Sequence, residues 1–300
     1  MTDMEFQTQL KQKVAEIEQI LEKYLPAEEG YQKTVLEAMN YSVRVGGKRL
    51  RPMLMQETYR MLGGKGNIIE PFMAAQEMIH TYSLVHDDLP AMDNDMYRRG
   101  KKTTHVLYGE AMAILAGDGL LNYAFETACK AFAMEPANEN IGKALTVLAG
   151  KAGIYGMIGG QVADVEAEKR GLALDEEKLM YIHEHKTAAL IQSSFMIGAI
   201  LAGAEEEDVK KLEKAAYNIG IAFQIQDDIL DVTSTLEVLG KPIGSDEKNN
   251  KLTYVKAHGL ENAKKDVEKL SKEALEILQG MHSRNEFLEQ LVAYLIHREK

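Results

Sequence analysis

Apolar residues recur with the period of an α-helix along almost the whole 300-residue chain. The helices expected from this pattern span residues 4–24, 31–45, 51–62, 71–88, 109–134, 139–168, 175–203, 205–233, 259–279 and 285–298. Gly and Pro separate them, and no alternating apolar–polar stretch of convincing strand length interrupts them. Two stretches, 109–124 and 188–203, are apolar on nearly every side, which is typical of helices inside a large bundle. The sequence therefore predicts an all-α helical bundle, with residues 1–300 as a single domain.

The composition narrows the class of protein. Trp is absent and there are only six Pro, as expected of a helical chain, and the net charge of −11 argues against nucleic acid as a partner. The single cysteine, Cys129, excludes an intramolecular disulfide and is expected to be a small buried side chain in an amphipathic helix. The N-terminus lacks the features of a signal peptide, and no segment approaches the about 18 apolar residues of a membrane span. These features predict a cytoplasmic protein without a membrane span.

A polar stripe on the helix expected at 71–88 leads into a dense cluster of carboxylates. Gln76, His80, Ser83 and Asp87 are spaced by four, three and four residues, so they share one face of an otherwise apolar helix. The cluster itself, HDDLPAMDND at residues 86–95, contains Asp87, Asp88, Asp93 and Asp95. Carboxylates this close repel one another unless water screens them or a cation lies between them.

The stretch FQIQDDILDVTS, residues 223–234, repeats this design on a second helix. Asp227 and Asp231 are four residues apart on one face, Asp228 lies beside them, and Gln224 lies one turn earlier. A polar stripe flanked by apolar surface suits a helix that lines an internal cavity. A calcium loop of the EF-hand type beginning at Asp93 lacks the required Gly and Glu. Carboxylates without His or Cys partners instead favour Mg²⁺.

Basic residues near both clusters complete the pattern. Lys48, Arg49 and Arg51 follow a glycine pair in GGKRLRP (46–52), at an expected helix start whose N–H groups also favour anions. Further cations stand after the first cluster or near the second: Arg98, Arg99, Lys186 and Lys241. Arginine binds phosphate oxygens with two parallel hydrogen bonds, and Mg²⁺ neutralises the remaining charge. The sequence thus predicts a cavity with an apolar wall whose mouth binds a polyphosphate through Mg²⁺.

Taken in order, these motifs resemble the blocks of the trans-isoprenyl diphosphate synthases. DDLPAMD (87–93) and DDILD (227–231) match the two aspartate-rich motifs of that family. Further matches are GGKRLRP, GGQVADVE (159–166), HKTAALI, FQIQDDILD and GKPIGSDEKNNKLTY, from about residue 30 to the C-terminus. The resemblance implies the isoprenoid synthase fold around a deep central cavity, assembled as a homodimer. It also implies a Mg²⁺-dependent carbocation reaction that joins isopentenyl diphosphate to dimethylallyl or geranyl diphosphate and releases pyrophosphate.

The resemblance also implies roles for single residues. The implied metal ligands, for three Mg²⁺ ions with substrate bound, are Asp87, Asp93, Asp227 and Asp231, with Asp88 in support. The implied contacts to the allylic diphosphate are Arg98, Lys186, Thr187, Gln224 and Lys241, and those to isopentenyl diphosphate are Lys48, Arg51, His80 and Arg99. The residues expected to be catalytic are Asp87, Asp88, Asp93, Arg98, Lys186, Asp227 and Lys241. Asp164 and Asp246 match positions behind these groups, and His86 is expected to pack rather than to act as a base.

The length of the product is expected to depend on Tyr82 and Ser83. Tyr82 stands five residues before Asp87, about 7.5 Å along a helix axis, where its ring could stop growth at fifteen carbons. Ser83 lies closer to the face of Asp87, so the expectation of farnesyl diphosphate rests more on the family rule than on geometry. A geranylgeranyl product, and Tyr82 as an ordinary core aromatic, stay open.

Three rival classes remain to be weighed. A class I terpene cyclase usually carries an Asn/Asp, Ser/Thr, Glu motif where this chain has DDILD. A non-catalytic subunit of a heteromeric prenyltransferase typically loses aspartates, and none is missing here. A purely structural acidic bundle would leave the two polar stripes unexplained.

Overall fold

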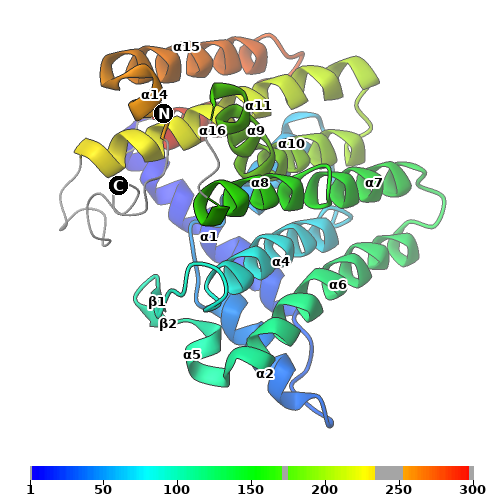
Figure 1. Cartoon of the computed structure of the whole chain (residues 1–300). Helices are drawn as coiled ribbons and strands as arrows, with labels where there is room; N and C mark the ends of the chain where they lie inside the picture. Colours follow the sequence, from blue (N-terminus) through cyan, green and yellow to red (C-terminus); the bar gives the residue numbers. More distant parts are fainter. Residues whose placement is uncertain (1, 171–174, 234–252, 297–300) are drawn as a thin grey trace.

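The computed structural model describes residues 2–170, 175–233 and 253–296, and these are almost entirely helical (Figure 1). The helices of the first half are α1 (Asp3–Tyr24), α2 (Lys33–Arg44), α3 (Leu50–Met61), α4 (Glu70–Asp87), α5 (Thr104–Tyr108), α6 (Glu110–Met134) and α7 (Asn140–Ala152). Those of the second half are α8 (Met157–Arg170), α9 (Glu176–Ile182), the π-helix η1 (His183–Ala188), α10 (Ala189–Leu201), α11 (Glu206–Thr233), α14 (Tyr254–His258), α15 (Leu260–Gln279) and α16 (Glu286–Ile296). The prediction of an all-α fold is confirmed.

One short hairpin is the exception to the helical pattern. Strands β1 (Tyr97–Arg98) and β2 (Lys101–Lys102) pair antiparallel directly after the first aspartate cluster. The two-residue strands are too short to show an alternating pattern, so they were not predicted from the sequence. The hairpin turns the chain back towards the end of α4.

Helix α10 lies at the centre of the bundle and packs against α3, α7 and α11. It is buried on nearly every side, as its apolar sequence predicts. Gly198 makes close packing possible, because a Cβ added there would lie 2.5 Å from the backbone oxygen of Met55 on α3. The core that surrounds α10 includes the fully buried rings of Phe72 and Phe195.

The burial expected for residues 109–124 is only half right. Helix α6 packs against α4, but Ile114, which borders a cavity, and Leu115 are 46% and 49% exposed. Cys129 on the same helix is also exposed, so the prediction of a buried cysteine is wrong. The reason is that an apolar surface in a sequence looks the same whether the chain's own core or another molecule covers it.

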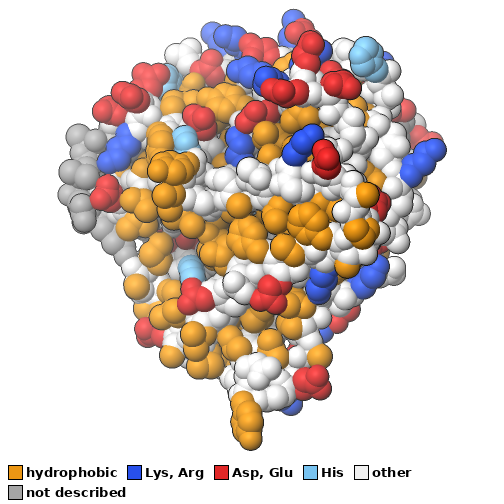
Figure 2. Space-filling view, turned by 90° about the vertical axis from the view of Figure 1, so that its right-hand side faces the viewer, with side chains coloured by type: hydrophobic (Ala, Val, Ile, Leu, Met, Phe, Trp, Pro, Cys, Tyr) orange, Lys and Arg blue, Asp and Glu red, His pale blue; other side chains and the backbone are white. Residues whose placement is uncertain are grey.

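Figure 2 shows how exposed groups divide on one side of the molecule. Charged side chains gather at the top, where α15 lies, and apolar side chains gather lower, at the height of α6 to α8. No helix among the described residues is long and apolar enough to cross a membrane.

Two helices expected to be continuous are interrupted. The helix expected at 139–168 is α7 and α8, separated by a turn that contains Gly153 and Gly156. The helix expected at 175–203 is α9, η1 and α10. The second interruption shapes the site described next.

Candidate functional site

A cavity of about 940 Å³ opens between α4, α6, α8 and η1. Its wall is largely apolar and includes Leu84, Leu89, Met92, Leu121, Met157 and Ile158. Its polar lining includes Arg51, His80, Ser83, Asp87, Gln161 and Lys186. A cavity with an apolar wall is therefore present, as predicted, and the stripe on α4 lines it. None of its lining residues lies on the described helix α11 (Glu206–Thr233), which carries the second stripe, so that part of the prediction is not met.

The stripe on α4 divides into two parts. His80, Ser83 and Asp87 line the cavity, as predicted. Gln76, at the other end, is buried and binds α10: its Nε2 donates to the carbonyl of Leu190 at 3.0 Å, and its Oε1 accepts from the Ser193 hydroxyl at 3.0 Å. Gln76 therefore fixes the distance between the two helices.

Asp87 ends α4, and the chain then folds back so that Asp93 returns to it. The backbone N–H of Asp93 donates to the carbonyl of Asp87 at 2.9 Å, and Gln161 Nε2 donates to Asp87 Oδ1 at 2.6 Å. Burial raises the pKa of Asp87 to about 6, against the opposing effect of Lys186. Ionising a carboxylate in this setting is unfavourable, and a cation bound in the cavity would stabilise its ionised form.

Asp88 and Arg98 bind each other. Arg98 donates from Nε to Asp88 Oδ1 and Oδ2 at 2.8 and 3.0 Å and from Nη2 to Oδ1 at 2.6 Å. Asp88 is buried, and the β1–β2 hairpin carries Arg98 to it. Arg99, the next residue, lies over Gly47, where an added Cβ would be 2.5 Å from Arg99 Nη1. The hairpin thus joins the aspartate cluster to the GGKRLRP segment.

The π-helix η1 brings Lys186 and Thr187 to the cavity. A π-turn inserts one residue into the helical register, and such turns are frequent at functional sites. Lys186 Nζ lies 2.5 Å from Asp164 Oδ2 on α8, and the Thr187 hydroxyl donates to Gln224 Oε1 at 2.9 Å. Gly160 permits this approach, because a Cβ there would lie 2.2 Å from the backbone nitrogen of Lys186.

The second aspartate cluster lies on α11. Asp228 is buried and accepts hydrogen bonds from Gln224 Nε2 at 3.3 Å and from the backbone N–H of Tyr254 at 2.7 Å, so it ties α11 to α14. Asp227 and Asp231 are partly buried on the same helix. His183 Nε2 lies 3.9 Å from Asp228 Oδ2, and burial lowers the pKa of His183 to about 4.

The carboxylates fit a Mg²⁺ ion that shares its ligands with substrate. Within residues 2–170, 175–233 and 253–296, no group of three or more His, Cys, Asp or Glu side chains is close enough to hold a metal unaided. Asp87 is the last residue of α4 and Asp93 lies in the turn that follows, whereas Asp227 and Asp231 lie on α11. Mg²⁺ usually takes one or two carboxylates and completes its shell with water and phosphate oxygens.

A second group of cations lies at the start of α3. Burial lowers the pKa of Arg51 to about 10, and its buried Nε has no hydrogen-bond partner among the described residues. Burial and the nearby charges of Arg51 and Arg99 lower the pKa of His80 well below its usual value. Lys48 does not line the central cavity; it borders a separate pocket with Leu10, Val14, Leu50 and Tyr294.

Two of the expected site residues, Lys241 and Asp246, lie outside the described residues. Conversely, sequence reasoning missed Gln161 and His183. Gln161 stands in the quoted block GGQVADVE, and its position after two glycines was the available signal. His183 had no comparable signal.

Tyr82 forms part of the cavity wall on α4. Its side chain is buried, its hydroxyl has no hydrogen-bond partner among the described residues, and its ring meets His86 edge-on at 5.8 Å between centroids. His86 Nε2 lies 3.1 Å from the carbonyl of Ile114, and the ring rests on Gly117 of α6. This placement agrees with the packing role expected for His86.

The site as a whole belongs to a class of helical enzymes that take a charged head group at the mouth of a cavity and an apolar chain inside it. Comparison with known proteins gives the family. The family described as Polyprenyl synthetase matches residues 32–295. The chain belongs to this polyprenyl synthetase family and is a short-chain trans-prenyltransferase of isoprenoid biosynthesis.

Similar proteins differ in their products. The farnesyl diphosphate synthase of Geobacillus stearothermophilus is 47% identical over 256 residues, 84% of this chain and 84% of that enzyme. The geranylgeranyl diphosphate synthase of Cyanophora paradoxa is 45% identical over 276 residues, 92% of this chain and 90% of that enzyme. A geranyltransferase structure from Helicobacter pylori, complexed with magnesium and isoprenyl diphosphate, has a TM-score of 0.82 at 32% identity and covers 96% of this chain and 95% of its own. Overall similarity therefore leaves the product length undecided.

Proposed function

We propose that this chain is a farnesyl diphosphate synthase, which condenses isopentenyl diphosphate with dimethylallyl and then geranyl diphosphate. The observation that carries the proposal is the position of Tyr82. Its ring is buried in the cavity wall, five residues and about 1.4 turns before Asp87, and meets His86 edge-on. A growing chain whose diphosphate lies at Asp87 would meet this ring, and its length would stop there.

The proposed ligands of Mg²⁺ are Asp87, Asp93, Asp227 and Asp231, with three ions bound when substrate is bound. The magnesium in the similar geranyltransferase from Helicobacter pylori supports this proposal. When bound, Mg²⁺ would stabilise the negative charge that grows on the departing pyrophosphate. Asp88, fixed by Arg98, would hold the turn between Asp87 and Asp93.

The remaining polar residues would hold the two diphosphates. For the allylic substrate we propose Arg98, Lys186, Thr187, Gln224 and Lys241, and for isopentenyl diphosphate Lys48, Arg51, His80 and Arg99. Arg98 uses Nε and Nη2 on Asp88, so its contact with substrate would come from Nη1. Asp164 would aim the Lys186 ammonium, which it already binds.

The apolar wall serves the reaction itself. Breaking the allylic C–O bond leaves a carbocation, which water would convert into an alcohol, so the wall must exclude water. The carbocation joins the double bond of isopentenyl diphosphate, and loss of a proton to the departing pyrophosphate completes the product. No histidine base is required, in keeping with the contact between His86 and α6.

We also propose that the enzyme is a cytoplasmic homodimer with one domain per chain. The exposed side chain of Leu115 on α6, which does not line the cavity, is part of the apolar surface that a second copy would cover. Burial of such a face by a partner removes apolar area from water.

The test is product analysis with purified protein, Mg²⁺, labelled isopentenyl diphosphate and geranyl diphosphate. A fifteen-carbon product that lengthens in Tyr82→Ala is expected. Thr81→Ala is the matched control, because the buried Thr81 hydroxyl binds its own helix at the carbonyl of Glu77 and does not line the cavity. A twenty-carbon product from the unaltered protein would make it a geranylgeranyl diphosphate synthase. Absence of any Mg²⁺-dependent product would point to a subunit that needs a different partner.

A further inference from the structure

Arg49 stands between two residues of the proposed isopentenyl diphosphate site, yet its own side chain is not available to a ligand. The residue is 2% exposed. Its Nε and Nη2 donate to Glu18 of α1 at 2.7 and 3.2 Å, its Nη1 donates to Glu77 of α4 at 2.7 Å, and Nη2 also donates to the carbonyl of Val43 at 2.6 Å. One guanidinium therefore connects α1, α4 and the last turn of α2.

The backbone of Arg49 is in an unfavourable conformation. Its φ of 50° is left-handed, and it follows Gly46 and Gly47, whose φ values are 92° and 151°. A non-glycine residue is strained in this region, so other contacts must hold it there. Arg99 also has a left-handed φ, 53°, and its guanidinium covers Gly47. Strain and close packing thus concentrate in residues 46–49, directly before Arg51.

Glu77 gives the contacts of Arg49 an electrostatic role. It is buried, and its charge opposes the lowering of the pKa that burial causes at Arg51. Its charge has the same effect on the pKa of Arg99, whose guanidinium is partly desolvated although the residue as a whole is exposed. Glu77 is therefore close enough to attract the same arginines that a diphosphate would bind. Arg49, at 2.7 Å, is the cation that Glu77 contacts directly.

We propose that Arg49 is a positioning residue for isopentenyl diphosphate: it holds residues 46–51 in the conformation that presents Arg51, and it keeps Glu77 from competing with the diphosphate for Arg51 and Arg99. This inference rests on the proposed function, because it takes Arg51 and Arg99 as contacts of that substrate.

The test compares Arg49→Met, Arg49→Lys and the double variant Arg49→Met/Glu77→Gln. Loss of one partner of a buried charge pair has large effects, so Arg49→Met is expected to raise KM for isopentenyl diphosphate at least about tenfold. KM for geranyl diphosphate and kcat should each change less than about threefold, because Lys186 and Thr187 are held by other contacts. Arg49→Lys should fall between the wild type and Arg49→Met. The double variant should have a KM for isopentenyl diphosphate at least about threefold lower than that of Arg49→Met, because the competing charge of Glu77 is gone.

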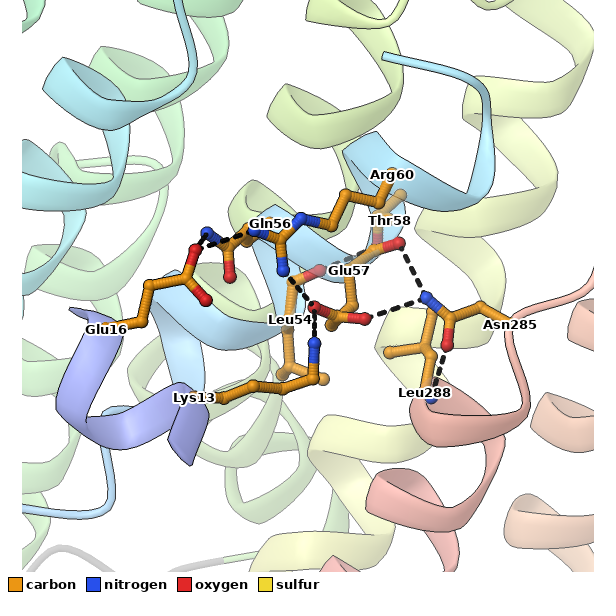
Figure 3. Close-up of polar contacts among 9 residues, drawn as sticks. All are labelled: Lys13, Glu16, Leu54, Gln56, Glu57, Thr58, Arg60, Asn285 and Leu288. Atoms are coloured by element: carbon orange, nitrogen blue, oxygen red, sulfur yellow. Dashed lines mark hydrogen bonds and ion pairs between the residues drawn. The ribbon is translucent and has the colours of Figure 1, made fainter. Parts of the chain in front are cut away.

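Lys13→Met is the matched control (Figure 3). Lys13 on α1 also binds a buried carboxylate of α3, Glu57, at 2.5 Å, and Glu57 is further held by Arg60 and Asn285. Glu57 lies about 12 Å along the helix from Arg49. This variant should lower Tm, as Arg49→Met does, but leave both KM values unchanged.

A purely structural role for Arg49 would lower Tm in Arg49→Met and leave KM for isopentenyl diphosphate unchanged, and that result overturns the proposal. An equal rise of both KM values, or a double variant no better than Arg49→Met, also overturns it. The assignment of the product length is tested separately. If the wild type makes a twenty-carbon product, the KM values for isopentenyl diphosphate and geranyl diphosphate can still be compared between the variants. If the wild type makes no product, calorimetric titration with isopentenyl diphosphate gives the same comparison. If Arg49→Met does not fold, the same KM values are compared between the wild type, Arg49→Lys and the double variant.

Discussion

Asp87→Asn is expected to stabilise the metal-free protein while abolishing its activity. Burial raises the pKa of Asp87 to about 6 from an ordinary value of 3.8, so the folded state disfavours the ionised form. At 1.36 kcal/mol per pKa unit, a shift of about two units costs at most about 3 kcal/mol at neutral pH. The asparagine amide removes that charge and can still accept the hydrogen bond from Gln161. Lys186 keeps Asp164 as its partner, so we expect a gain of between about 1 and about 3 kcal/mol.

The pH dependence of this gain follows from the sign of the shift. The pKa is higher in the folded state than in the unfolded state, so the penalty is fully present above pH 6 and disappears as the pH falls from about 6 towards 3.8. In buffer with EDTA, Tm of Asp87→Asn should exceed that of the wild type by several degrees at pH 7.5, because 1 kcal/mol corresponds to about 2–4 °C in chains of roughly this size. The difference should shrink at pH 5.

With ligands bound, the wild type should have a higher Tm than Asp87→Asn, the reverse of the order without ligands. A ligand that binds only the folded state at 100 times its Kd adds about 2.7 kcal/mol to stability. With Mg²⁺ and pyrophosphate, the wild type should gain this stabilisation and Asp87→Asn should gain much less. Asp93→Asn is the control, because the Asp93 side chain is exposed and should alter the metal-free Tm little. An Asp87→Asn protein that melts at or below the wild type at pH 7.5 without metal would refute the reasoning.

Three further predictions concern contacts around the cavity. Arg98→Lys loses the two-pronged contact with Asp88, so we expect Tm to fall and kcat to drop at least about tenfold in steady-state assays. Gly160→Ala places a Cβ 2.2 Å from the backbone of Lys186, so it should reduce kcat far more than Gly142→Ala, which has open space and should be neutral or stabilising. Gly117→Ala would displace the His86 ring, whose Nε2 would lie 2.0 Å from the new Cβ, towards the cavity, and product analysis should show a shift to shorter chains.

The sequence predicted the cavity because α4 carries polar groups on one face at helical spacing, whereas the stripe on α11 contributes no lining residue to it. His80, Ser83 and Asp87 line the cavity at the spacing read from the sequence. Asp88 shows the limit of this reasoning. Its partner Arg98 reaches it only because a hairpin of two-residue strands turns the chain back, and such strands leave no periodic pattern.

Other features were hidden for different physical reasons. The π-turn of η1 is invisible to apolar periodicity, since α9 and α10 on either side both follow the ordinary helical period. In the structure, Gly160 permits the close approach of α8 to η1, a contact that the sequence analysis did not predict. The exposed face of α6 could not be predicted, because apolar side chains do not specify which molecule covers them.

Two charged groups that line the cavity, Asp87 and Arg51, follow one principle. Burial opposes ionisation of Asp87, whose pKa is about 6, and of Arg51, whose pKa is about 10. Neither group gains its full countercharge from the protein: Asp87 faces the cavity, and the buried Nε of Arg51 has no partner among the described residues. Cations and diphosphates would supply those countercharges, so binding would relieve a destabilisation built into the fold. Interactions completed only by the substrates lower the free energy of the bound states selectively, which is why a site of this kind sacrifices stability of the empty protein.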